Sequence, residues 1–179
     1  MRVISGLYKG RRLKAPTWEG LRPTSDKLRE TLFNVLAPRV EGARVLDGYA
    51  GTGAVGIEAL SRGAAHVTFV DRDRRAQALI AENIAHCRIP SGCVIIRPSF
   101  DRLGTFDIVL LDPPYDVRPD DALTMAAPLV SANGAATSGI VVLEHAKRQQ
   151  APSDVAGLAQ TRQITSGDSA LSFYAACPR

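Results

Sequence analysis

The sequence predicts an α/β fold with a doubly wound, mostly parallel sheet, and three observations support this. From about residue 43, short apolar segments alternate with amphipathic ones over short connections, which is typical of strand–helix units. Residues 106–111 are apolar at nearly every position, as a parallel strand buried on both faces requires. Residues 161–175 have the pattern of a closing hairpin with a Ser-Gly-Asp turn, which predicts an antiparallel edge.

Ahead of these units we expect a small N-terminal extension. Residues 1–15 are predicted to form a short β-hairpin, with Gly6 and Gly10 in turn positions. A loop follows, and Thr24 or Ser25 is the predicted N-cap of an amphipathic helix that ends before Pro38.

The remaining elements follow from periodicity and from glycine and proline boundaries. Strands are expected at 44–47, 66–70, 93–96, 106–111 and 139–143, with two more in the hairpin, which makes seven in the sheet. Helices are expected at about 53–62, 73–86 and 121–130.

Composition excludes several classes of protein. The 179 residues are 45% hydrophobic and 22% charged, the mix of a globular protein. No apolar run reaches the roughly 18–20 residues of a membrane span, and the N-terminus lacks the pattern of a signal peptide, so we expect a cytoplasmic protein. The three cysteines and three histidines lack the spacing of a disulfide framework or a zinc site, and we expect no metal.

Positive charge is concentrated at the N-terminus. Residues 1–44 contain ten Lys and Arg but four Asp and Glu, whereas the whole chain has a net charge of +4. A dense basic segment is typical of a surface that binds a polyanion, although a solvated charged face is an equally good interpretation of charge alone. The candidate nucleic-acid contacts are Arg2, Lys9, Arg11, Arg12, Lys14 and Arg22.

The first motif is a glycine-rich turn between a strand and a helix. It comprises Asp47, Gly48, Tyr49, Ala50, Gly51, Thr52 and Gly53, and Asp71 ends the next strand. Glycines allow a ligand to approach the backbone, and a terminal carboxylate can bind ribose hydroxyls. With Gly56, the turn also satisfies the G-x-G-x-x-G pattern of dinucleotide sites, so NAD is a candidate. However, Asp47 would face the pyrophosphate, and its carboxylate suits the ammonium of S-adenosylmethionine better.

The second motif is Asp112-Pro113-Pro114-Tyr115, which follows the predicted strand at 106–111. Two prolines restrict the backbone, so that the Asp112 carboxylate and the Pro113 carbonyl can serve as two fixed acceptors. Two acceptors match the two protons of one exocyclic amino group, and Tyr115 offers a ring on which a base can stack. We expect this motif and the glycine turn at one edge of the sheet, where ligands bind in such folds.

These residues make the chain resemble the RsmD family of bacterial 16S rRNA guanine-N2 methyltransferases. The resemblance extends over nearly the whole chain. Its marks are residues 2–6 with 9–13, Arg22-Pro23-Thr24 followed by Arg29, Phe33 and Asn34, residues 47–53 continuing into 56–64, the Asp112–Tyr115 motif, and Gly167-Asp168.

The resemblance implies a Rossmann-like class I methyltransferase that uses S-adenosylmethionine to methylate the N2 amino group of one guanine in 16S rRNA, within the 30S subunit or a late assembly intermediate. It implies that residues 47–53 hold the methionyl part of the cofactor, Asp71 the ribose, and Ser99 and Phe100 the adenine, with Thr24 and Arg72 also in the cofactor site. Asp112 to Tyr115 would be the catalytic motif. Residues 1–22 would be a basic extension that docks on RNA, and residues 23–179 the methyltransferase domain.

Three other functions compete with this interpretation. An adenine-N6 methyltransferase acting on DNA or RNA would also use Asp-Pro-Pro-Tyr, but a DNA enzyme usually needs a recognition region for which this chain has little room. An NAD-dependent oxidoreductase leaves Asp47 and the second motif unexplained. A non-catalytic RNA-binding protein leaves the intact Asp112 and glycine turn unexplained.

Overall fold

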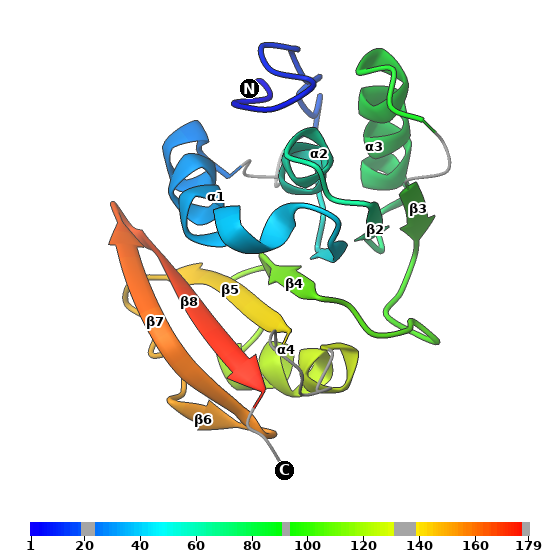
Figure 1. Cartoon of the computed structure of the whole chain (residues 1–179). Helices are drawn as coiled ribbons and strands as arrows, with labels where there is room; N and C mark the ends of the chain where they lie inside the picture. The colour runs from blue at the N-terminus through cyan, green and yellow to red at the C-terminus, as the bar shows by residue number, and fades with distance from the viewer. Residues whose placement is uncertain (19–23, 91–93, 131–138, 177–179) are drawn as a thin grey trace. The chain divides into compact units, whose positions relative to one another are not determined.

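Strands and helices alternate along most of the chain in the computed structural model, which describes residues 1–18, 24–90, 94–130 and 139–176 (Figure 1). The chain divides into two compact units, Met1–Asp101 and Arg102–Arg179. Within the described ranges no helix is both long and apolar enough to cross a membrane.

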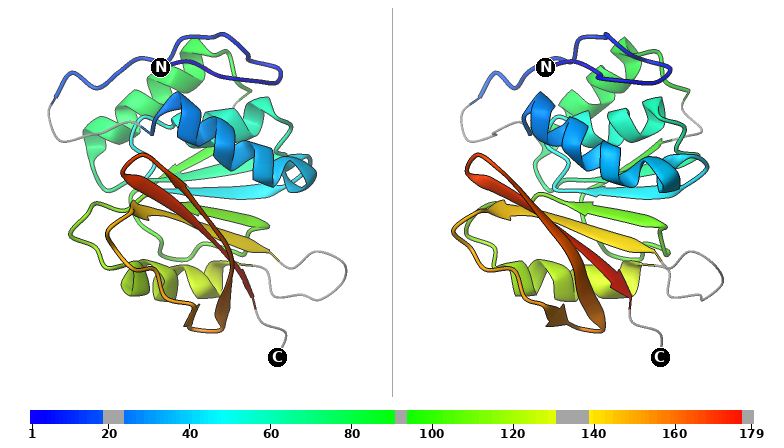
Figure 2. Two further views of the ribbon diagram at one scale, coloured as in Figure 1. Left: turned by 90° about the vertical axis from the view of Figure 1, so that its left-hand side faces the viewer. Right: turned by 60° about the vertical axis from the view of Figure 1, so that its left-hand side comes forward.

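The first unit contains three parallel strands in the order β3-β2-β1: β1 (Arg44–Gly48), β2 (His66–Val70) and β3 (Val94–Arg97). The helices α1 (Asp26–Val40), α2 (Ala54–Ser61) and α3 (Arg74–His86) lie on one side of these strands (Figure 2). All three strands match the prediction, except that Cys93 lies outside the described residues. The apolar side chains of β1 and β2 lie in the core, whereas Val94 and Ile96 of β3 are half-buried.

The helix boundaries confirm the predicted caps. The Ser25 hydroxyl accepts from Leu28 N at 3.2 Å, so Ser25 is the N-cap of α1. The prediction that this helix ends before Pro38 is wrong, because α1 continues to Val40. Pro38 is exposed and stands in the last turn, so its missing N–H removes only one bond close to the helix end. Gly63, with φ of 97°, follows α2 as predicted.

The N-terminal residues double back as predicted, but they form a looser structure than a regular hairpin. A single antiparallel bridge joins Arg2 and Arg12, and Gly6 and Gly10 adopt φ values of 83° and 82°. A backbone group that could extend the ladder is bonded elsewhere: Ser5 N, which would face Lys9 in this register, donates to Oε1 of Glu58 in α2 at 3.0 Å. Competition from α2 therefore limits the hairpin to one bridge.

The second unit contains five strands in the order β4-β5-β8-β7-β6. β4 (Ile108–Leu111) pairs in parallel with β5 (Ile140–Ala146), whereas β8 (Ser169–Ala176), β7 (Leu158–Ser166) and β6 (Asp154–Val155) add antiparallel pairs. The closing hairpin is confirmed, with Gly167 at φ of 61° in its two-residue turn. The described residues thus contain eight strands, one more than predicted, and the addition is the two-residue β6.

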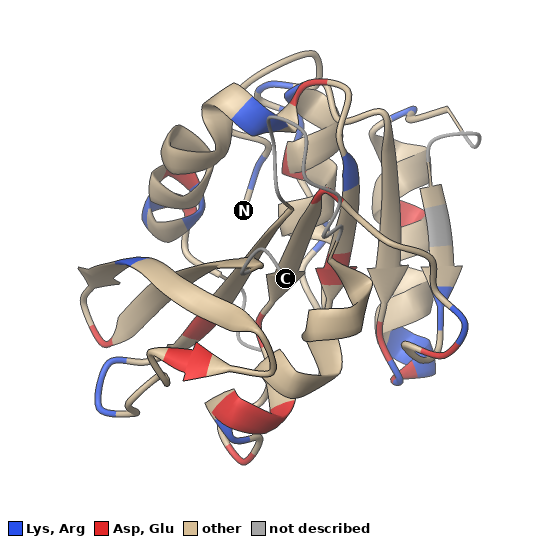
Figure 3. Cartoon of the chain, turned by 60° about the horizontal axis from the view of Figure 1, so that its bottom comes forward, with Lys and Arg blue, Asp and Glu red and all other residues tan. Residues whose placement is uncertain are grey.

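The remaining helix of the second unit is shorter than predicted. α4 spans Pro119–Ala126, and a 3-10 turn, Ala127–Leu129, completes the segment expected to be one helix. Pro119 begins α4, a position where its missing N–H is harmless, and Asp120 and Asp121 place negative charge in the first turn (Figure 3).

Candidate functional site

The glycine turn of the first unit connects β1 directly to α2. Asp47, at 4% exposure, is the next-to-last residue of β1, and its Oδ2 accepts a 2.8 Å hydrogen bond from Gly56 N in the first turn of α2. Tyr49, Gly51 and Gly53 all have positive φ, at 61°, 56° and 76°. This backbone suits glycine and is strained at Tyr49, which indicates a loop shaped for more than chain reversal.

Gly56 is required by packing. A Cβ at this position would lie 2.3 Å from Cε1 of Phe69 and 2.9 Å from Oδ2 of Asp47. The third glycine of the G-x-G-x-x-G pattern therefore allows α2 to approach β2 closely. The Asp47 carboxylate already occupies this helix N-terminus, so a pyrophosphate placed there would meet a negative charge. This arrangement favours a cationic ligand group over a dinucleotide.

Asp71, which follows β2, braces the same turn. Its Oδ2 accepts from Gly51 N at 2.8 Å, and its Oδ1 accepts from Asp73 N at 2.9 Å. A carboxylate has about four acceptor positions, so these two bonds leave capacity for two ligand hydroxyls. The sequence predicted a contact between Asp71 and the ribose but did not indicate its hydrogen bond to Gly51 N.

The segment after β3 contacts the glycine turn through two aromatic rings, Phe100 and Tyr49. The centroids of Phe100 and Tyr49 lie 5.4 Å apart at an interplanar angle of 54°. Burial raises the pKa of the Tyr49 hydroxyl, and the positive charge of Arg72 opposes that shift. Ser99 Oγ donates to Asp101 Oδ2 at 2.9 Å. Tyr49 of the turn is thus a neighbour of both Arg72 and Phe100 in the first unit, and the contact of these residues with a cofactor stays a prediction.

Thr24 stands immediately before the N-cap of α1, and its contact with the cofactor stays a prediction.

The Asp-Pro-Pro-Tyr loop in the second unit begins directly after β4. Asp112 is half-buried, and Tyr115 is 54% exposed. The carbonyl of Pro114 accepts from Val117 N at 2.9 Å, and that of Tyr115 accepts from Gln149 Nε2 at 3.2 Å. The loop backbone is therefore fixed just downstream of Asp112.

Gln149 is a residue of this site that the sequence reasoning missed. Its Oε1 accepts from Ala146 N at 3.2 Å, so one amide connects the end of β5 to the Tyr115 carbonyl. A glutamine in an exposed loop carries no sequence signal for such a role, because the contact depends on a residue 34 positions away.

The predicted nucleic-acid residues differ in how available they are. Arg2, Lys9 and Arg12 are exposed. The Arg11 guanidinium, however, donates to the Cys87 carbonyl and lies 4.8 Å from the centroid of the Tyr8 ring, so it serves the structure. Lys14 Nζ forms an exposed ion pair with Glu82 at 3.0 Å, and Arg22 lies outside the described residues.

A buried cluster of charges attaches the N-terminal residues to the helices. The Glu58 carboxylate, fully buried in α2, accepts from Ile4 N at 2.7 Å and from Ser5 N at 3.0 Å. It also accepts from Arg62 Nε at 2.8 Å and lies 3.9 Å from Nε of Arg29.

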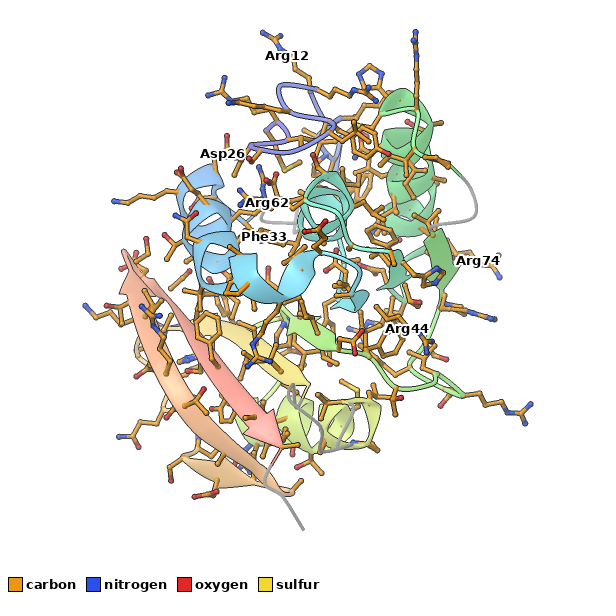
Figure 4. All side chains as sticks on the ribbon, in the orientation of Figure 1. Arg12, Asp26, Phe33, Arg44, Arg62 and Arg74 are labelled. Carbon is orange, nitrogen blue, oxygen red and sulfur yellow. The ribbon has the colours of Figure 1, made fainter. Side chains whose placement is uncertain are left out.

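Arg29 is fully buried in α1 and donates to the Arg2 carbonyl at 2.5 Å and to Asp26 at 2.9 Å. Burial lowers the pKa of its guanidinium, against the raising effect of Asp26 and Glu58. The Arg62 guanidinium lies 5.1 Å from the Phe33 ring centroid, between α1 and α2 (Figure 4). A charged residue within the apolar run of α2 was the available signal for this cluster.

Asn83 connects the N-terminal residues to the glycine turn. Its Oδ1 accepts from Lys14 N at 2.7 Å, and its Nδ2 donates to Thr52 O at 2.9 Å and to Lys14 O at 3.3 Å. The side chain is fully buried on the apolar face of α3. Its place in the helical repeat with Leu79 and Ile80 could have revealed it as a buried polar group.

His145 and Cys87 are buried and have structural roles. His145 is buried, with its ring nitrogens 3.0 Å from Ala146 O and 2.9 Å from Ser172 Oγ. Cys87 is free and buried, and burial raises the pKa of its thiol. Among the residues described, no group of three or more His, Cys, Asp and Glu could hold a metal ion.

Comparison with known proteins identifies the class and then the family. The structure of an Escherichia coli protein described as "Putative methyltransferase yhhF" superposes with a TM-score of 0.83 at 31% identity, over 100% of this chain and 99% of that one. The fold is that of the Rossmann-like class I methyltransferases. A family model described as conserved hypothetical protein 95 matches residues 1–175. The chain belongs to this family, which is the RsmD family.

Curated relatives support the same assignment. The Bacillus subtilis protein named "Putative rRNA methyltransferase YlbH" is 36% identical over 182 residues, 97% of this chain and 98% of that protein. The Escherichia coli protein named ribosomal RNA small subunit methyltransferase D is 43% identical over 119 residues, which are 64% of this chain and 60% of that protein.

Proposed function

We propose that this protein transfers the methyl group of S-adenosylmethionine to the exocyclic N2 amino group of a guanine in 16S rRNA. The observation that carries the proposal is the full-length similarity to a relative named as an rRNA methyltransferase, combined with both motifs intact. Relatives named for the small ribosomal subunit support 16S rRNA as the substrate. The guanine N2 position comes from the resemblance of the motifs.

The first unit supplies the proposed cofactor site. The buried Asp47 carboxylate would stabilise the ammonium of the methionyl group, and the backbone of residues 48–53 would line it. Asp71 has acceptor capacity left for the ribose hydroxyls. Phe100, in contact with Tyr49, would lie beside the adenine, with Ser99 next to it.

The second unit supplies the proposed acceptor site. The Asp112 carboxylate and the Pro113 carbonyl would each accept one proton of the N2 amino group, which favours a pyramidal nitrogen whose lone pair faces the methyl carbon. When the cofactor is bound, that nitrogen would attack the methyl carbon while the carbon–sulfur bond breaks, with S-adenosylhomocysteine as the leaving group. Asp112 stabilises the positive charge that builds on nitrogen, and the acidic ammonium product then releases a proton to water.

The target guanine would have to leave its stack to reach this site. Unpairing costs a few kcal/mol in a paired context, and stacking on the exposed Tyr115 ring offsets part of it, by about 1–3 kcal/mol. The 30S subunit or a late assembly intermediate is the proposed substrate, because the resemblance points to an assembled particle.

Labelled S-adenosylmethionine tests the proposal. Purified protein is incubated with small subunits, naked 16S rRNA and DNA, and the labelled nucleoside is mapped. We expect N2-methylguanosine in 16S rRNA, whereas N6-methyladenosine in DNA or RNA would support the alternative function.

Asp112 is tested separately. We expect Asp112→Ala to abolish turnover while cofactor affinity, measured by calorimetry, stays within about threefold, a difference below 1 kcal/mol. Asp71→Ala should show the opposite pattern, with cofactor binding lost first. Loss of cofactor binding in Asp112→Ala would contradict the assignment of Asp112 to the acceptor.

A further inference from the structure

The N-terminal residues present an apolar side chain on a basic surface. In residues 1–15, Val3, Tyr8 and Leu13 are buried within the first unit, whereas Leu7 is 77% exposed. Among the described residues, two large hydrophobic side chains are exposed: Leu7 and Tyr115 of the proposed catalytic motif. A single exposed leucine is common on protein surfaces, so what indicates a partner is how Leu7 is held and which charges lie beside it.

The backbone on both sides of Leu7 is anchored. Leu7 N donates to Ser61 O at 2.7 Å, and Tyr8 N donates to Ser61 Oγ at 2.9 Å. Gly6 adopts φ of 83° against the same residue, where a Cβ would lie 1.7 Å from Ser61 O. The backbone at Leu7 is therefore fixed, and Leu7 is held outward by it rather than carried on a loose loop.

The charges around Leu7 indicate what covers it. Residues 1–15 contain five Lys and Arg and no Asp or Glu. Lys9 and Arg12, close to Leu7 in sequence, are exposed, and the Arg12 side chain extends away from the ribbon (Figure 4). An apolar side chain flanked by cations matches a nucleic acid, which offers base faces between phosphates.

We propose that Leu7 packs against a nucleobase of the RNA substrate while Lys9 and Arg12 bind the adjacent phosphates. This inference rests on the proposed function and adds to it an apolar RNA contact outside the two motifs. Because Leu7 carries no charge, its contribution to RNA affinity should be independent of salt, whereas that of Lys9 should fall as salt rises.

Binding to small subunits and to naked 16S rRNA at several salt concentrations tests the two contributions. We expect Leu7→Ala to weaken RNA binding about tenfold at every salt concentration, which corresponds to about 1.4 kcal/mol. The matched variant Lys9→Ala should weaken binding and flatten the logarithmic salt dependence by about 0.7–0.9. Cofactor affinity should be unchanged in both, and Ala78→Ser, on an exposed position of α3, should bind as the wild type does.

A photoreactive diazirine side chain at position 7 identifies the partner on the particle itself. A crosslink that ribonuclease removes supports the proposal, whereas a crosslink to a ribosomal protein, or none, overturns it. Wild-type affinity of Leu7→Ala for both substrates would also overturn it. If the wild type transfers no methyl group to rRNA, the proposed function itself fails, and the two failures are therefore distinguishable.

Discussion

Replacing Glu58 with glutamine tests whether the buried charge cluster holds the N-terminal residues in place. Glu58 Oε1 accepts from Ser5 N and Arg62 Nε, and Oε2 accepts from Ile4 N and faces Arg29 Nε. Glutamine has the same shape but replaces one oxygen with an NH₂ group. In either orientation of the amide, that group faces two donors, so neither rotamer restores the network.

The expected cost follows from burial. Glu58 and Arg29 are both fully buried, and removing one partner of a buried ion pair destabilises a protein by about 3–5 kcal/mol. Asp26 still neutralises part of the Arg29 charge through its 2.9 Å contact. We therefore expect Glu58→Gln to lower the free energy of unfolding by about 3 kcal/mol, at the lower end of that range.

Urea unfolding followed by far-ultraviolet circular dichroism measures this difference. The matched control is Glu82→Gln, which removes an ion pair with Lys14 whose side chains are 54% and 56% exposed, and should cost less than about 1 kcal/mol. Hydrogen exchange should also be faster at the Ile4 and Ser5 amides in Glu58→Gln. A loss below about 1 kcal/mol with unchanged protection of those amides would refute the reasoning.

Two further predictions concern close packing and pH. Gly56→Ala should destabilise the chain by about 1–3 kcal/mol and weaken cofactor binding, because the new methyl group would clash with Phe69 and displace Asp47. Thermal unfolding measures the loss of stability, and calorimetry measures the loss of cofactor affinity. Wild-type values in both would contradict the close approach of α2 to β2. Burial raises the pKa of Tyr174 to about 12, above an ordinary value of 10.0. The folded state therefore keeps the Tyr174 proton to a higher pH than the unfolded state does. The stability that this difference contributes is complete below pH 10 and is lost as pH rises toward 12. Urea unfolding should show that Tyr174→Phe loses less stability between pH 9 and pH 11 than the wild type does, even though the variant lacks the 2.9 Å hydrogen bond to Pro152 O. An equal loss in both proteins would contradict the raised pKa of Tyr174.

Patterns of local periodicity predicted most elements, because burial of one face imposes a repeat on the sequence. In α3, Ala76, Leu79, Ile80 and Ile84 are buried as expected. Boundaries depended on chemistry that is also local, such as the Ser25 cap and the positive φ of Gly63. The continuation of α1 past Pro38 was missed because a proline in the last turn of a helix removes only one backbone hydrogen bond close to the end.

Predictions about individual side chains were less complete. Arg11 and Lys14 belong to the basic stretch that indicates a nucleic-acid surface, yet one bonds to Cys87 and the other pairs with Glu82. Sequence alone shows the charge of a residue but not its partners, because those partners lie 68–76 positions away. The same limitation hid the role of Gln149 behind the Tyr115 carbonyl.

The order of strands and helices, the glycine turn with its two carboxylates, and the Asp-Pro-Pro-Tyr motif were determined by the sequence itself, since each depends on neighbours within a few residues or on the repeat of one element. Only the tertiary structure decided that Glu58 binds the amides of Ile4 and Ser5, that Asn83 connects Lys14 to Thr52, and that Leu7 is displayed outward. These contacts join segments 31–69 positions apart, and a polar group takes such a partner because burial leaves it no water to bond.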